Sequence, residues 1–317
     1  MGVTLAERRD PGAMTAPSWR LLPLVGRRAP LRLAFAAPGP AARGTLLVLP
    51  GRAEFVEKYD ELIADLCRLG FAVAVLEWRG QGLSRHDGPF RQRGHIEDFA
   101  DYLEDLADAL RALDSAGAPA PRLMLGHSMG GHVGLRWLHD APASFAAAVM
   151  TAPMFGIAQV RRYEPVARVL ARTGVRAGAR LRYAPGQRDF AIARCRFDGN
   201  PLTSCPVRFA RFAGLLAARP ELALGGVTWG WLDAGLRSIA LTRRPGFAER
   251  ITTPILLCQA AEERIVCNRS IERLAAKLPA ARLCRFPGRH ELLLERDPIR
   301  AAVLGEIDRF LVAAAGV

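Results

Sequence analysis

Lysine is almost absent from this chain of 317 residues, with only Lys58 and Lys277 among its 44 basic residues. Arginine therefore carries nearly all of the net charge of +13, as in proteins of arginine-rich genomes. No apolar run reaches the ~18 residues that a membrane-spanning helix needs, and none is predicted. Half of the residues are hydrophobic and 24% are charged, a composition that predicts a soluble, folded chain.

The six cysteines form no C-x-x-C pair and no metal-ligand spacing. We expect them to be reduced, buried thiols of a cytoplasmic protein, and we predict no metal site. The first twenty residues include Glu7, Arg8 and Arg9 and have no apolar segment of the kind found in signal peptides. No secretory leader is therefore expected, and residues 1–17 are predicted to be a disordered tail.

Short apolar runs alternate with helical patterns along most of the chain. Thr45–Leu49 is entirely apolar after its first residue, as in strands buried on both faces of a parallel sheet. Similar runs cover residues 71–76, 123–125, 145–151, 254–258 and 282–286, and helices are expected over 55–69, 96–113, 271–277 and 299–313. The alternation predicts an α/β protein with a mostly parallel, doubly wound sheet, preceded by an antiparallel hairpin over residues 19–36.

A Gly-x-Ser-x-Gly motif directly follows the apolar run at 123–125. Gly126 and Gly130 flank Ser128 at the spacing that a sharp strand-to-helix turn requires, because larger side chains at both positions would collide. The turn is typical of the nucleophile elbow of an α/β-hydrolase. Ser128 is thus the candidate nucleophile, and the Met129 N–H, at the start of a helix, is a candidate oxyanion donor.

The loop after the strand at Thr45–Leu49 is expected to supply a second oxyanion donor, because it occupies that position in this fold. It reads Pro50-Gly51-Arg52. Gly51 permits a close backbone approach, so we assign the donor to the N–H of Arg52.

The same fold places an acid after the penultimate strand and a histidine after the last one. His290 is the only histidine in the C-terminal half and is the candidate general base. Glu262 and Glu263 both follow the run at 254–258, and either carboxylate suits the acid's role of orienting His290. We prefer Glu263.

Between residues 157 and 248 the strand–helix alternation stops. Hydrolases of this fold insert a lid at this point, so we predict a core over 18–156 and 249–317 and a mainly helical lid, or cap, over 157–248.

This segment holds 16 arginines and 5 acidic residues, a balance of +11, whereas the rest of the chain is close to neutral at +2. A basic segment that contains tryptophans suits an anionic membrane surface or a phosphate headgroup, and the chain has no nucleic-acid recognition motif. The candidate lid residues are Arg161, Arg162, Trp229 and Trp231.

Several motifs resemble those of one family. They are Leu49-Pro50-Gly51-Arg52-x-Glu54, Lys58-Tyr59, Trp78-Arg79-Gly80-Gln81-Gly82-x-Ser84, Gly126-His127-Ser128-Met129-Gly130-Gly131 and Gly288-Arg289-His290-Glu291. Together they resemble the bacterial lysophospholipase and monoacylglycerol lipase branch of the α/β-hydrolases, the serine aminopeptidase-type branch. The resemblance extends into the lid at Asn200-Pro201-Leu202-Thr203 and Thr228-Trp229-Gly230-Trp231. The chain departs from the family at Glu77 and Glu263, where the family has Asp, and at Cys267, where it has an acid.

We therefore expect a serine ester hydrolase that cleaves a single-chain lipid, above all a lysophospholipid, through an acyl-enzyme and without a cofactor. A monoacylglycerol lipase, a general carboxylesterase or an acyltransferase is the alternative within enzymes. A lipid-binding pseudo-hydrolase is the alternative outside them. The expected location is the cytoplasm, with peripheral contact at an anionic inner membrane face, and the sequence carries no signal for the oligomeric state.

Overall fold

The computed structural model describes residues 19–24, 31–39, 41–84 and 90–317. The predicted disordered tail over 1–17 and the turn of the predicted hairpin lie outside the described residues.

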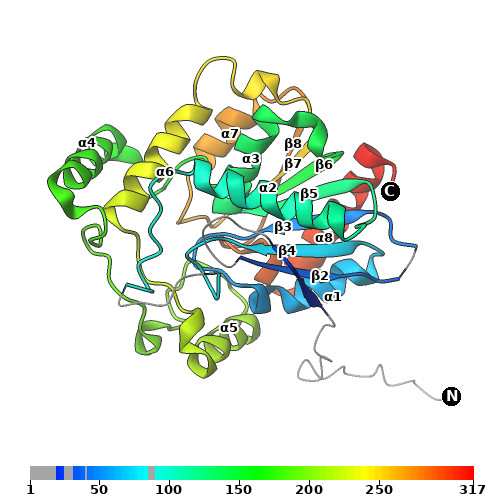
Figure 1. Ribbon diagram of the computed structural model, residues 1–317, viewed down its shortest axis with the longest axis horizontal. Coiled ribbons are helices and arrows are strands. Elements are labelled where there is room, and N and C mark those ends of the chain that lie inside the picture. Colours follow the sequence, from blue (N-terminus) through cyan, green and yellow to red (C-terminus); the bar gives the residue numbers. More distant parts are fainter. Residues whose placement is uncertain (1–18, 25–30, 40, 85–89) are drawn as a thin grey trace.

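One sheet organises the molecule, with strand order β1-β2-β4-β3-β5-β6-β7-β8 (Figure 1). β2 runs antiparallel to both β1 and β4, and every neighbouring pair from β4 to β8 is parallel. The predicted doubly wound sheet with a hairpin at its edge is confirmed. The strands are β1 (Arg20–Leu22), β2 (Arg32–Ala36), β3 (Thr45–Leu49), β4 (Ala72–Glu77), β5 (Arg122–His127), β6 (Ala147–Thr151), β7 (Ile255–Ala260) and β8 (Ala281–Phe286).

Helices cover both faces of this sheet, with α2, α3 and α7 on one side and α1 and α8 on the other (Figure 1). Each face has its own apolar core, and the central strands contribute to both because every residue of β3, β4, β6 and β7 is buried. The helices of the core are α1 (Asp60–Arg68), which follows a short 3-10 turn at Val56–Tyr59, α2 (Ala100–Ser115), α3 (Met129–Asp140), α7 (Asn268–Ala275) and α8 (Asp297–Ala315).

The segment between β6 and β7 is helical, as predicted for the insertion. It holds α4 (Glu164–Gly174), α5 (Pro206–Ala218) and α6 (Trp229–Thr242), joined by short turns and irregular stretches. α6 is largely buried against the core, whereas Ala171 is the only buried residue of α4. α4 packs on α6 and projects at the left edge of Figure 1.

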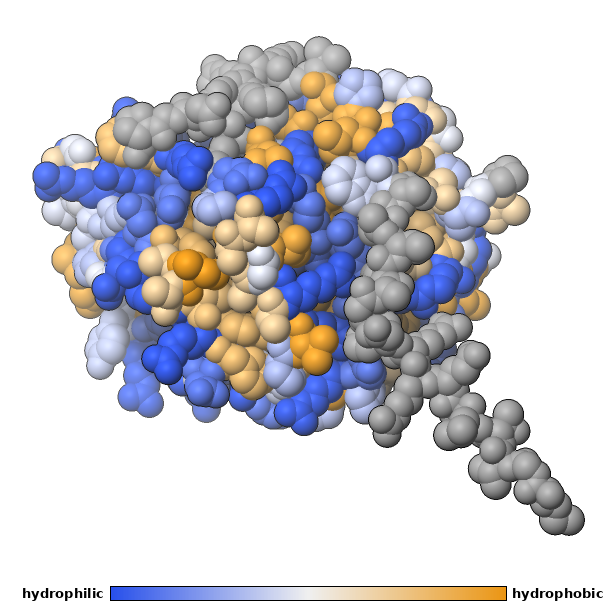
Figure 2. Space-filling view, turned by 90° about the horizontal axis from the view of Figure 1, so that it is seen from below, coloured by the Kyte–Doolittle hydropathy of each residue, from blue (hydrophilic) through white to orange (hydrophobic). Residues whose placement is uncertain are grey.

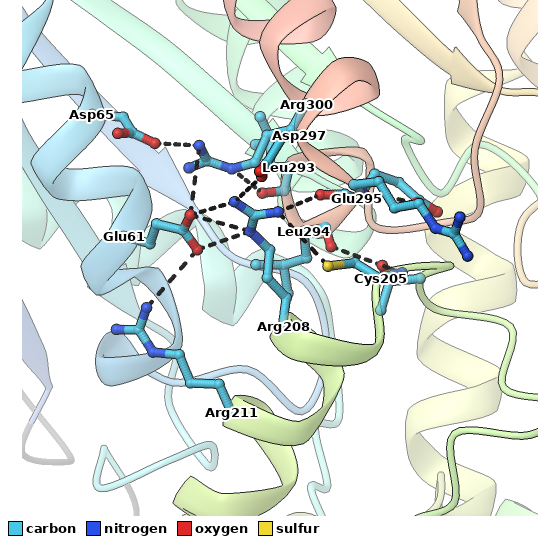
Figure 3. A network of polar contacts seen from close by, with 12 residues as sticks. Glu61, Asp65, Cys205, Arg208, Arg211, Leu293, Leu294, Glu295, Asp297 and Arg300 are labelled. Carbon is cyan, nitrogen blue, oxygen red and sulfur yellow. Dashed lines mark hydrogen bonds and ion pairs between the residues drawn. The ribbon is translucent and has the colours of Figure 1, made fainter. Parts of the chain in front are cut away.

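Buried and half-buried ion pairs fasten α5 to the core (Figure 3). The Arg208 guanidinium donates to Glu61 of α1 at 2.6 Å and lies 2.7 Å from Asp297 of α8. Arg300 of α8 pairs in turn with Asp65 of α1. Asp297 is exposed, but the side chains of Arg208, Glu61, Arg300 and Asp65 are at most 18% exposed. Pairing among these four is therefore stronger than that of an exposed pair, and it anchors α5 to the core.

The structure corrects one sequence expectation about cysteine. All six thiols are free, but Cys67, Cys195 and Cys284 are half-buried, and only the other three are buried.

Among the described residues, no helix combines the length and the hydropathy needed to cross a bilayer. On the face shown in Figure 2, hydrophilic residues surround separate apolar patches.

A buried histidine joins the core to the insertion. His132 of α3 is fully buried, its Nε2 lies 2.6 Å from the Ser238 hydroxyl of α6, and its ring packs edge-on against Phe99. Burial lowers the pKa of His132 from 6.5 to about 3, because the apolar surroundings disfavour the imidazolium. The ring is therefore neutral at physiological pH.

This histidine makes the stability of the fold depend on pH. Below pH 6.5 the unfolded chain binds a proton at His132 that the folded chain does not, so the stabilisation present above pH 6.5 is lost as the pH falls toward 3. Between pH 6.5 and 5 the loss is about 2 kcal/mol. We predict that His132→Gln, which does not titrate, shows a correspondingly shallower fall in urea-unfolding free energy. Parallel curves for the variant and the wild type would contradict this assignment.

Candidate active site

The turn from β5 to α3 presents Ser128 in a strained conformation, with φ 50° and ψ −114°. The two flanking glycines make this possible. A Cβ on Gly130 would overlap the carbonyl oxygen of Leu49 at the end of β3, and one on Gly126 would lie 2.7 Å from the Cα of Gly131. Crowding thus forbids side chains at the two positions where the sequence has glycine.

The loops after β7 and β8 bring an acid onto His290. Its Nδ1 lies 2.8 Å from Oε2 of Glu263, whose side chain is 1% exposed. The other Glu263 oxygen accepts N–H bonds from Ile265 and Val266. Burial alone would raise the pKa of Glu263, but the bonds from His290 and the two amides bring it below the usual value, so the carboxylate is ionised.

Glu262 points away from this pair. Its side chain is 64% exposed, and its nearest charged partner is Arg289, at 3.8 Å. The structure therefore places Glu263, rather than Glu262, at the histidine.

Ser128 and His290 line one cavity of about 570 Å³. The ring of His127, the residue before Ser128, lies 4.8 Å from the ring of His290. Burial lowers the pKa of His127 to about 4, so it is neutral and does not compete with His290 as a charged group. The cavity thus holds one serine on a strained turn and one histidine oriented by a carboxylate.

Two residues of the cavity lining have backbone amides without a hydrogen-bond partner in the described part of the chain. These residues are Arg52 and Met129. The Arg52 loop is held in place by its neighbours, since Trp78 donates to the Pro50 carbonyl at 2.8 Å and Ala53 donates to Gln81 at 2.6 Å. The two amides are thus available for an anionic oxygen at Ser128.

A buried set of charges lies beneath the cavity. The Lys58 ammonium contacts Glu54 at 2.6 Å and Glu291 at 2.7 Å, and these three side chains are at most 8% exposed. Glu54 also accepts the Gly51 N–H and the Tyr59 hydroxyl. The bridge through Lys58 therefore ties the loop that carries Arg52 to the loop that carries His290.

The two carboxylates of this bridge differ in their ease of ionisation. Burial opposes charge on Glu54, but Lys58 and its other neighbours lower its pKa to about 2. Burial raises the pKa of Glu291, and the nearby Glu54 charge adds to that effect. Glu54 is therefore the carboxyl group that ionises more readily opposite the Lys58 ammonium.

Three buried side chains at this position are of the types that bind metal ions. Ligand atoms of Glu54, His127 and Glu291 lie within 4.8 Å of one another, the one such group in the described part of the chain. The Lys58 ammonium already bonds both carboxylates, so the protein supplies the positive charge here itself.

No role was predicted for Lys58, Glu54 and Glu291, which stand in the sequence only as members of family motifs. One signal was available, because Lys58 is one of only two lysines in an arginine-rich chain. The loop over residues 77–84 is closed by hydrogen bonds to its first residue. Glu77 there accepts N–H bonds from Val56, Leu83 and Ser84.

The four candidate lid residues separate into two groups. Trp229 and Trp231 line the cavity. Arg161 and Arg162 are exposed and are not among its lining residues, and Arg161 instead lines a groove on the other side of α4. Both arginines lie in the short turn before α4, whereas Val160 before that turn and Ala167 and Leu170 of α4 line the cavity. A role for the two arginines in binding substrate stays a prediction.

Fold and site together define an α/β-hydrolase. A family model described as serine aminopeptidase, S33 (Hydrolase_4) matches residues 40–297. Lysophospholipase L2 of Escherichia coli is 34% identical over 84% of this chain and 79% of its own, and probable lysophospholipase L2 of Haemophilus influenzae is 30% identical over 86% and 85%. The fold is also that of monoglyceride lipase from Saccharomyces cerevisiae, with a TM-score of 0.73, 18% identity and coverage of 96% and 98%.

The chain belongs to the serine aminopeptidase S33 family and is a hydrolase. The α/β-hydrolase fold expected from the motifs is confirmed. The roles of the individual site residues stay predictions.

The two neighbouring glutamates provide a direct test of the acid. We predict that Glu263→Gln lowers kcat for a soluble ester by about 10³-fold, because His290 loses the partner that orients it and stabilises its charge. The matched change Glu262→Gln should stay within about twofold of the wild type, because that side chain is exposed. The measurement is kcat for the soluble ester, with purified variants whose melting temperatures equal that of the wild type. Equal losses of kcat in the two variants would exclude Glu263 as the acid.

Proposed function

We propose that this protein is a serine ester hydrolase that cleaves the acyl ester of a single-chain lipid, most directly a lysophospholipid. The observation that carries the proposal is a strained Ser128 in the same cavity as a His290 that is bonded to a buried Glu263. Such a set of groups suits nucleophilic acyl transfer.

In the proposed reaction, the Ser128 hydroxyl oxygen attacks the ester carbonyl carbon while His290 accepts the hydroxyl proton. The N–H groups of Arg52 and Met129 stabilise the oxyanion of the tetrahedral intermediate. The C–O bond of the ester then breaks, and the leaving alcohol takes the proton from His290. Water repeats the sequence on the acyl-enzyme and releases the fatty acid and free Ser128.

The shape of the cavity supports a single acyl chain. Its walls beyond the serine are mostly apolar and come largely from the insertion, including Ile157, Val160, Leu170 and Leu232. A volume of about 570 Å³ lies within the usual range for ligand pockets. The relatives named lysophospholipase L2, matched over most of their length, support lysophospholipid as the substrate.

We predict that the wild-type protein releases fatty acid from a lysophospholipid and that Ser128→Ala lowers this activity by ~10³-fold or more. The expected cause is loss of the nucleophile with the fold intact, so circular dichroism and the melting temperature should be unchanged. Free fatty acid released from lysophospholipid and from monoacylglycerol of the same chain length is the measurement. A preference for monoacylglycerol would favour a monoacylglycerol lipase, and no turnover by the folded wild type would favour a lipid-binding protein.

We further propose that residues 157–248 act as the lid and that α4 contacts an anionic membrane surface. The outer side of α4 exposes Tyr163, Val166 and Val169, which are 56–67% exposed. The adjoining groove of about 440 Å³ is lined by Arg161, Arg168, Arg243, Arg269 and Arg273, and Glu164 is the one acid among the described residues of its lining. Exposed apolar side chains beside arginines suit shallow insertion into an anionic interface.

This surface contact should make lipid hydrolysis sensitive to salt. Attraction to an anionic bilayer is worth ~1 kcal/mol per basic residue and is screened within ~10 Å at 0.1 M salt. We predict that hydrolysis of lysophospholipid in anionic vesicles falls as salt rises, while hydrolysis of a small soluble ester does not. Arg161→Gln with Arg162→Gln should reproduce part of that fall.

The matched control is the pair Arg68→Gln and Arg111→Gln, which removes the same charge from α1 and α2 at positions 71% and 66% exposed. Vesicle sedimentation at two salt concentrations reports binding separately from hydrolysis. Equal effects of the two pairs would show that net charge, and not α4, governs the response.

A further inference from the structure

Arg52 carries a side chain that the proposed reaction does not use. Arg52 lines the same cavity as Ser128. Its side-chain Nη2 donates to the carbonyls of Gly225 and Gly226 at 2.9 and 2.7 Å, and its Cζ lies 5.3 Å from the centre of the Trp231 ring. These contacts fix the guanidinium at the border between the core and the insertion. They leave Nε and Nη1 without an acceptor among the described residues, and Nε is buried.

The positive charge of Arg52 is not compensated by a carboxylate. Other well-shielded arginines pair with acids, as Arg32 does with Glu57 and Glu77 and Arg300 does with Asp65. Arg52 forms no ion pair with any residue that the structure describes. Burial lowers its pKa to about 10, so the group remains charged at neutral pH. A shielded, uncompensated cation costs folding free energy, and a ligand anion in the cavity would offset that cost.

The length of the arginine side chain matches the proposed substrate. One path runs along arginine, from its amide nitrogen to its guanidinium carbon. The other runs along a 1-acyl lysophospholipid, from its ester carbonyl carbon to its phosphorus. The two paths contain the same number of bonds. With the carbonyl oxygen at the Arg52 N–H, the substrate chain is therefore long enough for its phosphate to reach the guanidinium of the same residue. Guanidinium donors also match phosphate oxygens in pairs.

We infer that the Arg52 side chain binds the phosphate of a single-chain lipid ester while its backbone N–H holds the carbonyl oxygen. This inference rests on the proposed function and deepens it, because it explains how the cavity would distinguish a lysophospholipid from a neutral monoacylglycerol. Arg52 then binds the ester through its backbone N–H and the headgroup through its side chain.

The first experiment measures selectivity in neutral detergent micelles. The kcat/KM for a lysophospholipid is divided by that for the monoacylglycerol of the same acyl chain, in the wild type, Arg52→Gln, Arg52→Lys and the charge control Arg111→Gln. Loss of a charge-assisted hydrogen bond should lower the ratio about tenfold or more in Arg52→Gln. The lysine variant should be intermediate, and the control should keep the wild-type ratio.

A ratio that does not change in Arg52→Gln would overturn the inference even if both activities fall. That result is expected if the guanidinium only holds the carbonyls of Gly225 and Gly226, because such a role affects both substrates alike. The ratio therefore separates headgroup binding from a structural role.

The second experiment does not need turnover, so it stays informative if the proposed hydrolysis fails. Calorimetry compares binding of dodecyl phosphate, dodecanol and inorganic phosphate to Ser128→Ala and to Ser128→Ala with Arg52→Gln. We expect dodecyl phosphate to bind tightest and to lose about tenfold in affinity with Arg52→Gln, while dodecanol is unaffected. Equal loss for dodecanol, or inorganic phosphate binding as tightly as dodecyl phosphate, would overturn the assignment to a lipid headgroup.

Discussion

The contact between the Gly130 backbone and the end of β3 determines the geometry of the site. β3 and β5 are parallel neighbours with Leu49 opposite Gly126, so the two loops that follow them leave the sheet side by side. Only a glycine at position 130 lets α3 begin against the Leu49 carbonyl. This close approach places Met129, Ser128 and the Arg52 loop around one cavity, and the strain at Ser128 is the local cost of that arrangement.

Buried charges hold the surrounding loops in register. Lys58 joins Glu54, in the loop after β3, to Glu291, in the loop after β8, although 233 residues separate Lys58 from Glu291. Breaking a buried pair of this kind leaves an unpaired charge at a cost of ~3–5 kcal/mol. Arg52 differs from Lys58 in this respect, because it is a shielded cation that forms no ion pair with any residue that the structure describes.

Much of the fold was predictable because its signals are local. The central strands are mostly apolar, and the Gly-x-Ser-x-Gly spacing of the elbow can be read within five residues. The position of Glu263 was predictable from the order of the loops, because this fold places the acid after the penultimate strand and the histidine after the last one. The hairpin edge and the helical insertion were likewise predictable, whereas half of the cysteines are less buried than expected.

The features that sequence could not reveal depend on contacts between distant segments. Arg161 and Arg162 lie in the turn before α4, and α4 packs on α6, so their placement depends on contacts that charge alone does not reveal. The Arg52 side chain ends at carbonyls of Gly225 and Gly226, in the insertion. No periodicity in either segment indicates that they meet.

The most direct test is a crystal structure of the protein after reaction with a fluorophosphonate that carries one alkyl chain. The proposed site requires phosphorus on Ser128 Oγ, the phosphonyl oxygen within hydrogen-bond distance of the Arg52 and Met129 amides, and His290 still bonded to Glu263. An adduct on another serine, or a phosphonyl oxygen directed away from both amides, would contradict it.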